Sequence, residues 1–347
     1  MLPMPLPAVC WQDYSQVTNH KEIKNTTVNY KEFQEMLHAS FKSKDTEEWL
    51  DVHFTRPIGL LFALMWKRLG VHPNAITILS IFLGVGAAFM FYYTDPIHNL
   101  AGVALLMAAN FCDSTDGQLA RLTGQKTLIG RMLDGFSGDV WFFAIYVAIA
   151  LRLMSQTIPG LYSIWGMWIW ALAIIAGVLC HSPQSSLADY YRQIHLFFLK
   201  GKEGSELDSA AQQRQIYESL PKGKAWLQRA FYYNYANYCK SQEQRTPAFQ
   251  RMAAAIKTRY GGLAALPAPL KQRFLDGSRP LMKYTNILTF NTRAICIYAT
   301  CLLDCPYVYL LIEITVMNIL YLYMRKNHEV LCQTILQTIE KEQNGQV

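Results

Sequence analysis

The stretch DSTDGQLARLTGQKTLIGRMLDGFSGD, residues 113–139, carries four aspartates and three basic residues between two apolar runs. LAGVALLMAANFC precedes it and VWFFAIYVAIALRLM follows it, and both runs have the composition of lipid-buried helices. Charged side chains inside a membrane are costly and usually functional. The stretch therefore predicts a polar site at the end of one membrane span and the start of the next.

The whole chain has the composition of a membrane protein. Only 16% of its 347 residues are charged and 52% are hydrophobic, whereas soluble domains contain about 25% charged residues. Segments of about 20 mostly apolar residues predict transmembrane helices. Six segments qualify: 74–93, 98–120, 128–153, 160–180, 286–303 and 307–324. The expected fold is all-α, a polytopic membrane protein with about six transmembrane helices.

The remaining composition divides the chain into further parts. The segment FTRPIGLLFALMWKRLG, residues 54–70, is too short and too charged at its end to cross a membrane, which favours an N-terminal interfacial helix. A helix packed under the protein is the alternative. The predicted organisation is a polar arm (1–52), the interfacial amphipathic helix (53–70), a transmembrane core of spans one to four (71–199), a helical insertion (200–282), spans five and six (283–325) and a polar C-terminal tail (326–347).

Basic residues predict the orientation, because loops rich in Lys and Arg stay on the cytoplasmic side. Such residues precede the first span, separate the second from the third, fill the insertion and follow the sixth; they include Lys67, Arg68, Arg121, Lys126, Arg131, Arg325 and Lys326. The opposite connections, YYTDPIHN and LDCPY, have none, and the third has only Arg152. Both termini, the insertion and the aspartate stretch are expected in the cytoplasm. The opening MLPMPLPAVCWQDYSQ has neither a basic start nor an apolar run, so no signal peptide is expected.

Five residues of the quoted stretch share one helical face, because their offsets of 0, 3, 4, 7 and 8 positions fall on the same side. Asp113 and Asp116 project together from this face. Gly117 and Ala120 leave a shallow bare patch where a flat group, such as a nucleobase, can approach the backbone. Arg121, one turn further, can fork onto a phosphate.

Paired carboxylates repel each other unless a cation lies between them, and oxygen-only ligands select Mg²⁺, Mn²⁺ or Ca²⁺. The next helix is predicted to begin near Thr127 and carries Asp134. If it packs antiparallel to the first, Asp134 joins Asp113 and Asp116. The expected site is a carboxylate cage for one or two divalent ions that holds a diphosphate. Two ions about 4 Å apart would stabilise the leaving group of an in-line displacement.

The stretch closely resembles the signature of the CDP-alcohol phosphotransferase (CDP-alcohol phosphatidyltransferase) family. That signature runs Asp, two residues, Asp-Gly, two residues, Ala-Arg, eight residues, Gly, three residues, Asp, three residues, Asp. The positions that match in identity and spacing are Asp113, Asp116, Gly117, Ala120, Arg121, Gly130 and Asp134. HPNAIT, residues 72–77, looks like the Pro-Asn-x-x-Thr that opens the family's first span. The resemblance covers spans one to four.

The resemblance implies an enzyme that transfers a phosphate-bearing group from a CDP-linked donor to an alcohol and releases CMP. It implies Asp113, Asp116, Asp134 and the fourth aspartate as ligands of Mg²⁺ or Mn²⁺, with two ions expected. The implied lining of the CDP pocket consists of Gly117, Ala120, Arg121 and Thr127, with Asn74 and Thr77 at its border. A homodimer and a membrane lipid are also implied as partners, and no nucleic acid is expected.

The last position of the signature departs from the family. The family's fourth aspartate, the general base, belongs at 138, but this chain has Gly138 followed by Asp139. On a regular helix Asp139 lies about 140° from Asp134, whereas position 138 lies about 40° away. A π-bulge would bring Asp139 into place as metal ligand and catalytic base. The alternatives are a base supplied elsewhere, or a structural role for Asp139.

Two segments predict the acceptor site. The fourth span ends in CHSPQSSLADYYRQIHLFF and the fifth opens with TNILTFNTR, so polar residues cluster at the same membrane face. Arg192 and Arg293 are the candidate anion contacts, because a membrane-embedded Arg usually faces a polar cavity or a counter-charge. For His181 and His195 a structural role is favoured. Glu313 in the sixth span is either a packing partner or part of a cavity.

Several functions remain open within this framework. The favoured one is transfer of a phosphatidyl group from CDP-diacylglycerol to a small polar alcohol, such as inositol, inositol phosphate, serine or glycerol phosphate, in phospholipid biosynthesis. The alternative is transfer of phosphoethanolamine or phosphocholine from a CDP-alcohol to diacylglycerol or ceramide. An ion transporter is a different class, although the carboxylates cluster at one surface and do not step across the bilayer. A non-catalytic membrane scaffold is a further class, because position 138 lacks its aspartate.

Overall fold

The structure is a computed structural model that describes residues 30–41, 43, 45–125, 127–223 and 225–343. These residues form helices joined by short connections and contain no β-strand, as the sequence predicts. Within the predicted polar arm, the described residues form one helix before the arm ends, α2 (Tyr30–Ser40). The predictions for the rest of the arm up to residue 29, including the absence of a signal peptide, and for the end of the tail lie outside the described residues.

The helices of the first half are α3 (Arg56–Arg68), α4 (Pro73–Phe91), α5 (Pro96–Thr123), α6 (Leu128–Met154), α7 (Trp168–Ile174) and α8 (Ser182–Lys200), with the π-helical segments η1 (Asp51–Thr55) before α3 and η2 (Ile175–His181) between α7 and α8. Those of the second half are α9 (Ala210–Ser219), α10 (Trp226–Arg245), α11 (Pro247–Tyr260), α12 (Ala268–Ser278), α13 (Met282–Ile287), α14 (Phe290–Leu302), α15 (Tyr307–Ile314) and α16 (Val316–Gln343). Short 3₁₀ turns are Lys202–Gly204, Leu263–Ala265 and Arg279–Leu281.

Four continuous helical stretches of the described chain are long and apolar enough to cross a membrane: Pro73–Phe91, Ile129–Met154, Trp168–Lys200 and Tyr307–Glu342. They make the chain a multi-pass membrane protein. Of the six predicted spans, the second and the fifth are not among these stretches. Helix α5 has 28 residues, but polar side chains such as His98 and Asn99 lower its hydropathy. Helix α14 has only 13 residues, short of the about 20 that a crossing needs.

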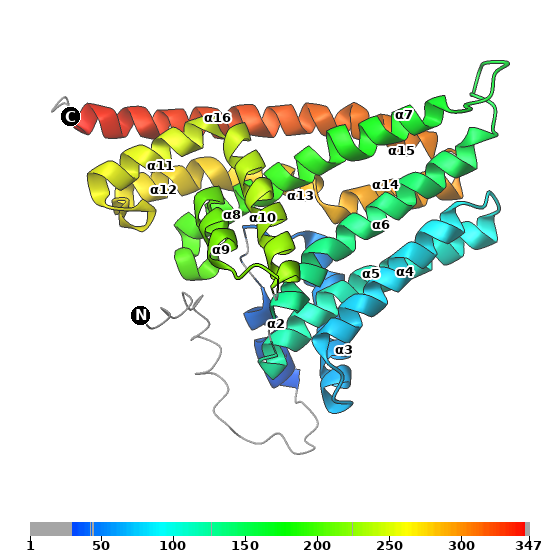
Figure 1. The fold of residues 1–347 in the computed structure, drawn as a ribbon, viewed down its shortest axis with the longest axis horizontal. Helices are drawn as coiled ribbons and strands as arrows, with labels where there is room; N and C mark the ends of the chain where they lie inside the picture. The colour runs from blue at the N-terminus through cyan, green and yellow to red at the C-terminus, as the bar shows by residue number, and fades with distance from the viewer. Residues whose placement is uncertain (1–29, 42, 44, 126, 224, 344–347) are drawn as a thin grey trace.

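The chain reverses between α5 and α6 through a short turn with clear end signals. Gly124 ends α5 with φ +70°, a left-handed conformation that glycine adopts without a Cβ penalty. Thr127 then caps α6, and its hydroxyl accepts a hydrogen bond from the amide of Gly130 at 2.9 Å. Helices α4, α5 and α6 consequently run side by side (Figure 1). The turn folds the quoted stretch back on itself, so its two ends face each other.

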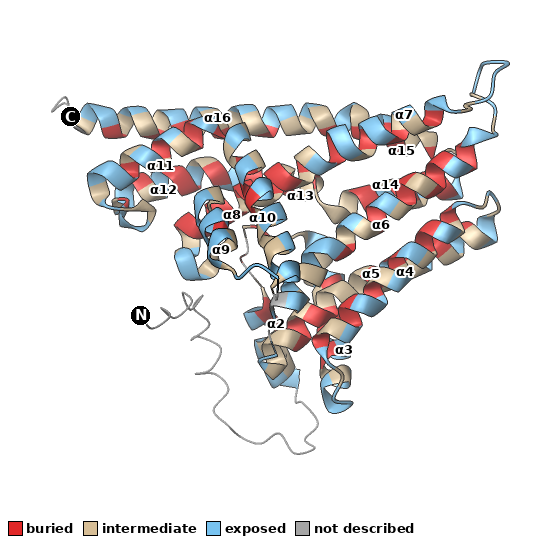
Figure 2. Cartoon of the chain, viewed as in Figure 1, coloured by how far each residue is buried: buried red, intermediate tan, exposed pale blue. Residues whose placement is uncertain are grey.

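Close helix contacts hold this bundle together. A Cβ on Gly84 of α4 would lie 2.1 Å from the ring of Trp141 on α6, and a Cβ on Gly102 of α5 would lie 2.7 Å from the ring of Phe91. The aromatic rings occupy the space that side chains at 84 and 102 would fill. Figure 2 shows the buried residues following the inward faces of these helices. At the end of the bundle away from the aspartates, buried Arg152 pairs with Asp304 at 2.6 Å.

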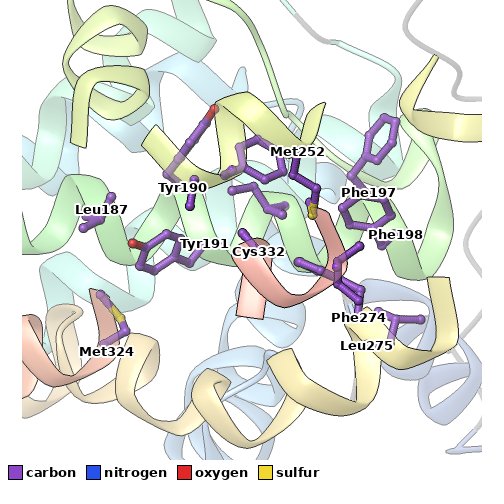
Figure 3. Close-up of a cluster of buried hydrophobic side chains, with 14 of the residues drawn as sticks. Leu187, Tyr190, Tyr191, Phe197, Phe198, Met252, Phe274, Leu275, Met324 and Cys332 are labelled. Atoms are coloured by element: carbon purple, nitrogen blue, oxygen red, sulfur yellow. The ribbon is translucent and has the colours of Figure 1, made fainter. Parts of the chain in front are cut away.

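The insertion packs on α8 and on the second half of α16. Their shared core contains Tyr191 and Phe198 from α8, Met252 from α11, Phe274 from α12 and Cys332 from α16 (Figure 3). The segment predicted as a polar tail is thus mostly helical through Gln343, and its described part buries four residues, His328, Cys332, Ile335 and Ile339. Because α16 continues one of the candidate spans, the insertion is attached directly to the membrane part.

Helix α3 lies against the aspartate-bearing helix α5. A Cβ on Gly59 would lie 2.8 Å from Nε2 of Gln118 and 2.9 Å from Oγ of Ser114. The opposite side of α3 exposes large apolar residues: Leu61, Phe62, Met65 and Leu69. This two-sided character is compatible with the predicted interfacial helix, which stays a prediction.

Candidate metal centre and adjoining cavity

Three aspartates converge where α5 ends and α6 begins. Each of Asp113, Asp116 and Asp134 offers one carboxylate oxygen, and these oxygens all lie within 4.8 Å of one another. Asp113 and Asp116 stand one turn apart on α5, and the reversal at Gly124 brings Asp134 of α6 opposite them. The predicted antiparallel arrangement is therefore confirmed, and with it the meeting of these three carboxylates.

Hydroxyl groups from neighbouring helices orient two of the carboxylates. Thr77 of α4 donates a hydrogen bond to Oδ2 of Asp116. Ser137 of α6 donates to Oδ1 of Asp113 at 2.8 Å and to the carbonyl of Asp134 at 2.9 Å. Partners of this kind hold ligand side chains in place and tune their basicity. Ser137 was not predicted from the sequence, because its role depends on α5 facing α6.

The three carboxylates fit a hard divalent cation. Their donor atoms are all oxygen, the ligand type that Mg²⁺ and Mn²⁺ prefer. Two oxygens on opposite sides of one Mg²⁺ lie about 4.2 Å apart, since each Mg–O distance is about 2.1 Å. The observed 4.8 Å limit is close to this separation. Asp113, Asp116 and Asp134 could therefore bind a metal, as the sequence predicts.

The residues predicted to line a CDP pocket lie around the same helix ends. Asn74 of α4 bonds to Thr127 through Nδ2 at 3.3 Å. A Cβ on Gly117 would meet only Nη1 of Arg121, at an ordinary 3.6 Å. Nothing in the described fold therefore requires glycine at 117, although glycine costs about 1 kcal/mol in a helix. The glycine is explained if a ligand approaches the backbone there, beside Ala120 and Arg121.

Gly130 allows a prediction about this pocket. A Cβ there would lie 2.6 Å from Oδ1 of Asn74 and 3.1 Å from Oγ1 of Thr127. We expect Gly130→Ala to push Asn74 away, to lower the free energy of unfolding by about 1–3 kcal/mol and to raise the KM for a CDP-linked donor. Thermal unfolding in detergent and donor titration measure both effects.

The matched control for this prediction is Gly135→Ala on the same helix. A Cβ on Gly135 meets nothing within 4 Å. We expect it to preserve or raise stability, by up to about 1 kcal/mol through helix propensity. Equal stability of the Gly130→Ala and Gly135→Ala proteins would show that the contact between Asn74 and Gly130 is not close in solution.

Asp139 lies outside the three-carboxylate group. The proposed π-bulge is absent, because α6 is a continuous α-helix from Leu128 to Met154, and that part of the prediction is wrong. The π-helical segments of the described chain occur elsewhere, at Asp51–Thr55 and Ile175–His181. The regular helix turns Asp139 away from Asp134 and into the wall of a neighbouring cavity. Its role as metal ligand or base stays a prediction.

This cavity adjoins the metal centre and has a volume of about 250 Å³. Its walls come from α5, α6, the junction of η2 with α8, and the start of α14. The described lining residues are Asn110, Asp113, Asp134, Gly135, Ser137, Gly138, Asp139, Trp141, Phe142, His181, Ser185, Thr289, Phe290 and Arg293. Because Asp113 and Asp134 belong to both, a molecule in the cavity would touch the metal centre directly.

The two predicted acceptor contacts occupy different places. Arg293 lines the cavity but is fully buried and forms an ion pair with Glu313, with 3.0 Å between Nη2 and Oε1. Glu313 is therefore its packing partner. Arg192 lies outside the cavity lining and donates from Nη2 to Oδ1 of Asn286 at 3.1 Å. The acceptor roles of Arg192 and Arg293 stay predictions, and the geometry assigns Arg293 a buried pairing that the sequence did not reveal.

His181 and His195, the two histidines for which a structural role was favoured, lie in different places. His195 is buried, and its ring nitrogens contact Ser278 at 2.6 Å and Asp45 at 3.2 Å, which ties α8 to the insertion and to the N-terminal segment. His181 lies in the cavity wall, with its Nδ1 3.2 Å from the hydroxyl of Tyr146. Both contacts agree with a structural role, although His181 also faces the cavity.

The N-terminal segment reaches the cavity from outside. Glu48 accepts hydrogen bonds from the hydroxyl of Thr289, a lining residue, and from Nδ2 of Asn291 at 2.8 Å. Burial raises the pKa of Glu48 above its ordinary value of 4.5. Asp45, which precedes Glu48 in this segment, forms an ion pair with Arg279 at 3.1 Å. The segment before α3 thus supports the start of α14 at the cavity wall.

Taken together, these features define a multi-pass membrane protein in which three carboxylates that could hold a metal lie beside a cavity with polar and aromatic lining residues. Comparison with known proteins agrees with this class. Residues 70–194 match the model of the family described as CDP-alcohol phosphatidyltransferase. This region contains α4 to α6 and most of α8, and so all three converging aspartates. Over this part of the chain the protein is similar to that family.

Curated relatives match over part of the chain. An archaetidylinositol phosphate synthase of Pyrococcus horikoshii is 37% identical over 83 residues, which are 24% of this chain and 43% of that protein. A putative cardiolipin synthase of Mycobacterium tuberculosis is 28% identical over 116 residues, 29% of this chain and 54% of the relative. A bifunctional IPC transferase and DIPP synthase of Aquifex aeolicus is 28% identical over 105 residues, 30% of this chain and 22% of the relative.

Proposed function

We propose that this protein transfers a phosphate-bearing group from a CDP-linked donor to an alcohol and releases CMP. The observation that carries the proposal is the convergence of Asp113, Asp116 and Asp134 beside a cavity that also contains Asp139. The favoured form of the reaction takes a phosphatidyl group from CDP-diacylglycerol to a small polar alcohol. The names of the relatives, which include archaetidylinositol phosphate and cardiolipin synthases, support this form.

In this proposal different residues of the chain bind the donor, bind the acceptor and take the proton. Asn74, Thr77, Gly117, Ala120, Arg121 and Thr127 hold the donor, with Arg121 on the diphosphate. The acceptor hydroxyl, bound in the cavity, attacks the phosphorus that bears the transferred group. The bond from this phosphorus to the oxygen bridging to CMP breaks, CMP leaves with its electron pair, and Asp139 takes the hydroxyl proton. Bound Mg²⁺ or Mn²⁺ would supply electrostatic stabilisation of the leaving group.

The alternative form is transfer of phosphoethanolamine or phosphocholine from a CDP-alcohol to diacylglycerol or ceramide. Aromatic side chains in the cavity wall, Trp141, Phe142 and Phe290, favour it because they would tolerate a lipid acceptor. In either form we infer that the metal centre and both termini face the cytoplasm, since basic residues gather at this end. A homodimer is part of the proposal through the family alone.

Release of CMP from purified protein in detergent or vesicles tests the proposal. CDP-diacylglycerol and CDP-ethanolamine are offered separately with Mg²⁺ or Mn²⁺ and with a panel of alcohols. Metal-dependent release from CDP-diacylglycerol is the expected result, and release from CDP-ethanolamine alone would select the alternative form. Absence of release with every donor, in protein that still binds CDP and metal, would support the non-catalytic scaffold. Ion flux without release would support the transporter.

A further inference from the structure

The cavity beside the metal centre has an unusual balance of charge for a site that must bind an alcohol. Asp113, Asp134 and Asp139 line it, and of these three Asp139 lies outside the candidate metal centre. Among the described lining residues, Arg293 is the single lysine or arginine. Whether an acceptor with a phosphate group can bind therefore depends on whether the charge of Arg293 is available to it.

The guanidinium of Arg293 is hydrogen-bonded to protein groups through all of its nitrogens. Its Nε and Nη2 donate to the carboxylate of Glu313 at 3.0–3.2 Å, and Nη2 also donates to Oε1 of Gln184 at 2.7 Å. Its Nη1 donates to the backbone carbonyls of Leu288 and Thr289. A guanidinium has five N–H donors, and these contacts occupy all three of its nitrogens.

The ion pair is also well protected from solvent. Both side chains are essentially inaccessible, at 1% for Arg293 and 0% for Glu313. Breaking such a pair leaves an uncompensated buried charge, which is strongly unfavourable. To bind the guanidinium of Arg293, a phosphate in the cavity would have to displace Glu313. The guanidinium thus serves as a neutralised part of the wall and not as an anion receptor.

We propose that the acceptor carries no phosphate or carboxylate: it is an uncharged or cationic hydroxyl compound, selected by Asp139 in the cavity wall and by the Arg293–Glu313 pair. This inference rests on the proposed function and narrows its substrate class. An anion beside Asp139 would face like charge, and like-charge contacts of this kind are a common means of excluding wrong ligands. Ser185, Thr289 and His181 are suited to bind hydroxyl groups, because each can form neutral hydrogen bonds.

The test uses the intact protein and pairs of acceptors that differ by one phosphate. With CDP-diacylglycerol the pairs are inositol with inositol phosphate and glycerol with glycerol phosphate. With CDP-ethanolamine the pair is monoacylglycerol with lysophosphatidic acid. For whichever donor releases CMP, we expect kcat/KM to favour the unphosphorylated member by at least about tenfold. Preference for the phosphorylated member would overturn the inference and leave the proposed function standing. Absence of CMP release with every pair would overturn both.

Two variants examine the role of the ion pair. Glu313→Gln leaves the charge of Arg293 uncompensated, and we expect the preference to shift toward the phosphorylated acceptor by about tenfold. The double variant Arg293→Met with Glu313→Leu removes both charges, an exchange that folded proteins often tolerate, and it should keep the wild-type preference. If Glu313→Gln left the ratio of kcat/KM between the unphosphorylated and phosphorylated acceptors unchanged, the Arg293–Glu313 pair would have no role in acceptor selection. If that variant does not fold, the inference is tested by the acceptor pairs measured with the wild-type protein.

Discussion

Replacing Asp113 or Asp116 with asparagine is expected to abolish CMP release while the protein stays folded. Asparagine keeps the size of the side chain and can still accept the hydrogen bonds from Ser137 and Thr77. It removes the negative charge that a divalent ion needs. Loss of several kcal/mol of transition-state stabilisation corresponds to a decrease in kcat of about 1,000-fold or more.

The measurement for this first prediction is kcat for CMP release, together with thermal unfolding to show that the fold persists. The matched control is Asp95→Asn on the same helix. Asp95 caps the start of α5, where its side chain accepts from the amide of His98 at 3.1 Å, and asparagine is an equally good cap. At about 27 Å along the helix from Asp113, this change should leave activity unaltered. Near-normal activity of either metal-centre variant would show that the carboxylate group does not hold a catalytic metal.

Asp139→Asn is expected to lower kcat by about 100- to 10,000-fold, the range for loss of a general base. Asp139 lies in the cavity wall and outside the group formed by Asp113, Asp116 and Asp134. The dependence of the rate on Mg²⁺ concentration and the binding of CDP should therefore change little. This pattern separates a base from a metal ligand, because loss of a ligand would also weaken metal binding.

A second carboxylate position serves as the control for this prediction. A Cβ on Gly138 meets nothing within 4 Å, and Gly138 lines the same cavity as Asp139. In the Asp139→Asn protein, Gly138→Asp returns a carboxylate to this wall, and we expect part of the lost kcat to return. If Asp139→Asn by itself retained more than half of the wild-type kcat, the proton would be taken by another group.

Much of the metal centre could be predicted because it depends on local geometry. Asp113, Asp116, Gly117 and Arg121 lie on one helix, so their spacing alone places them on a common face. The approach of Asp134 was also predictable, because Gly124 and Thr127 mark a short turn between two long helices. Ser137 was missed, since its hydrogen bond to Asp113 joins two helices that face each other.

Other predictions failed where packing overrides composition. The structure supports four of the six predicted membrane spans, and α14, at the predicted fifth span, has only 13 residues before the connection LDCPY. The π-bulge expected near Gly138 is absent, and the regular helix directs Asp139 to the cavity instead. The spacing places Asp139 about 140° from Asp134 if the helix is regular. Only the structure shows that α6 is regular there.

The sequence by itself determined the membrane character of the chain, the three metal-binding candidates and the family signature, because hydropathy and helical spacing are properties of short segments. Only the tertiary structure decided what surrounds the acceptor cavity. Arg293 and Glu313 lie 20 residues apart on different helices, and their charges cancel only because α14 and α15 bring them within 3.0 Å of each other. The strength of a charge in a membrane depends on its nearest counter-charge, and that neighbour is set by packing.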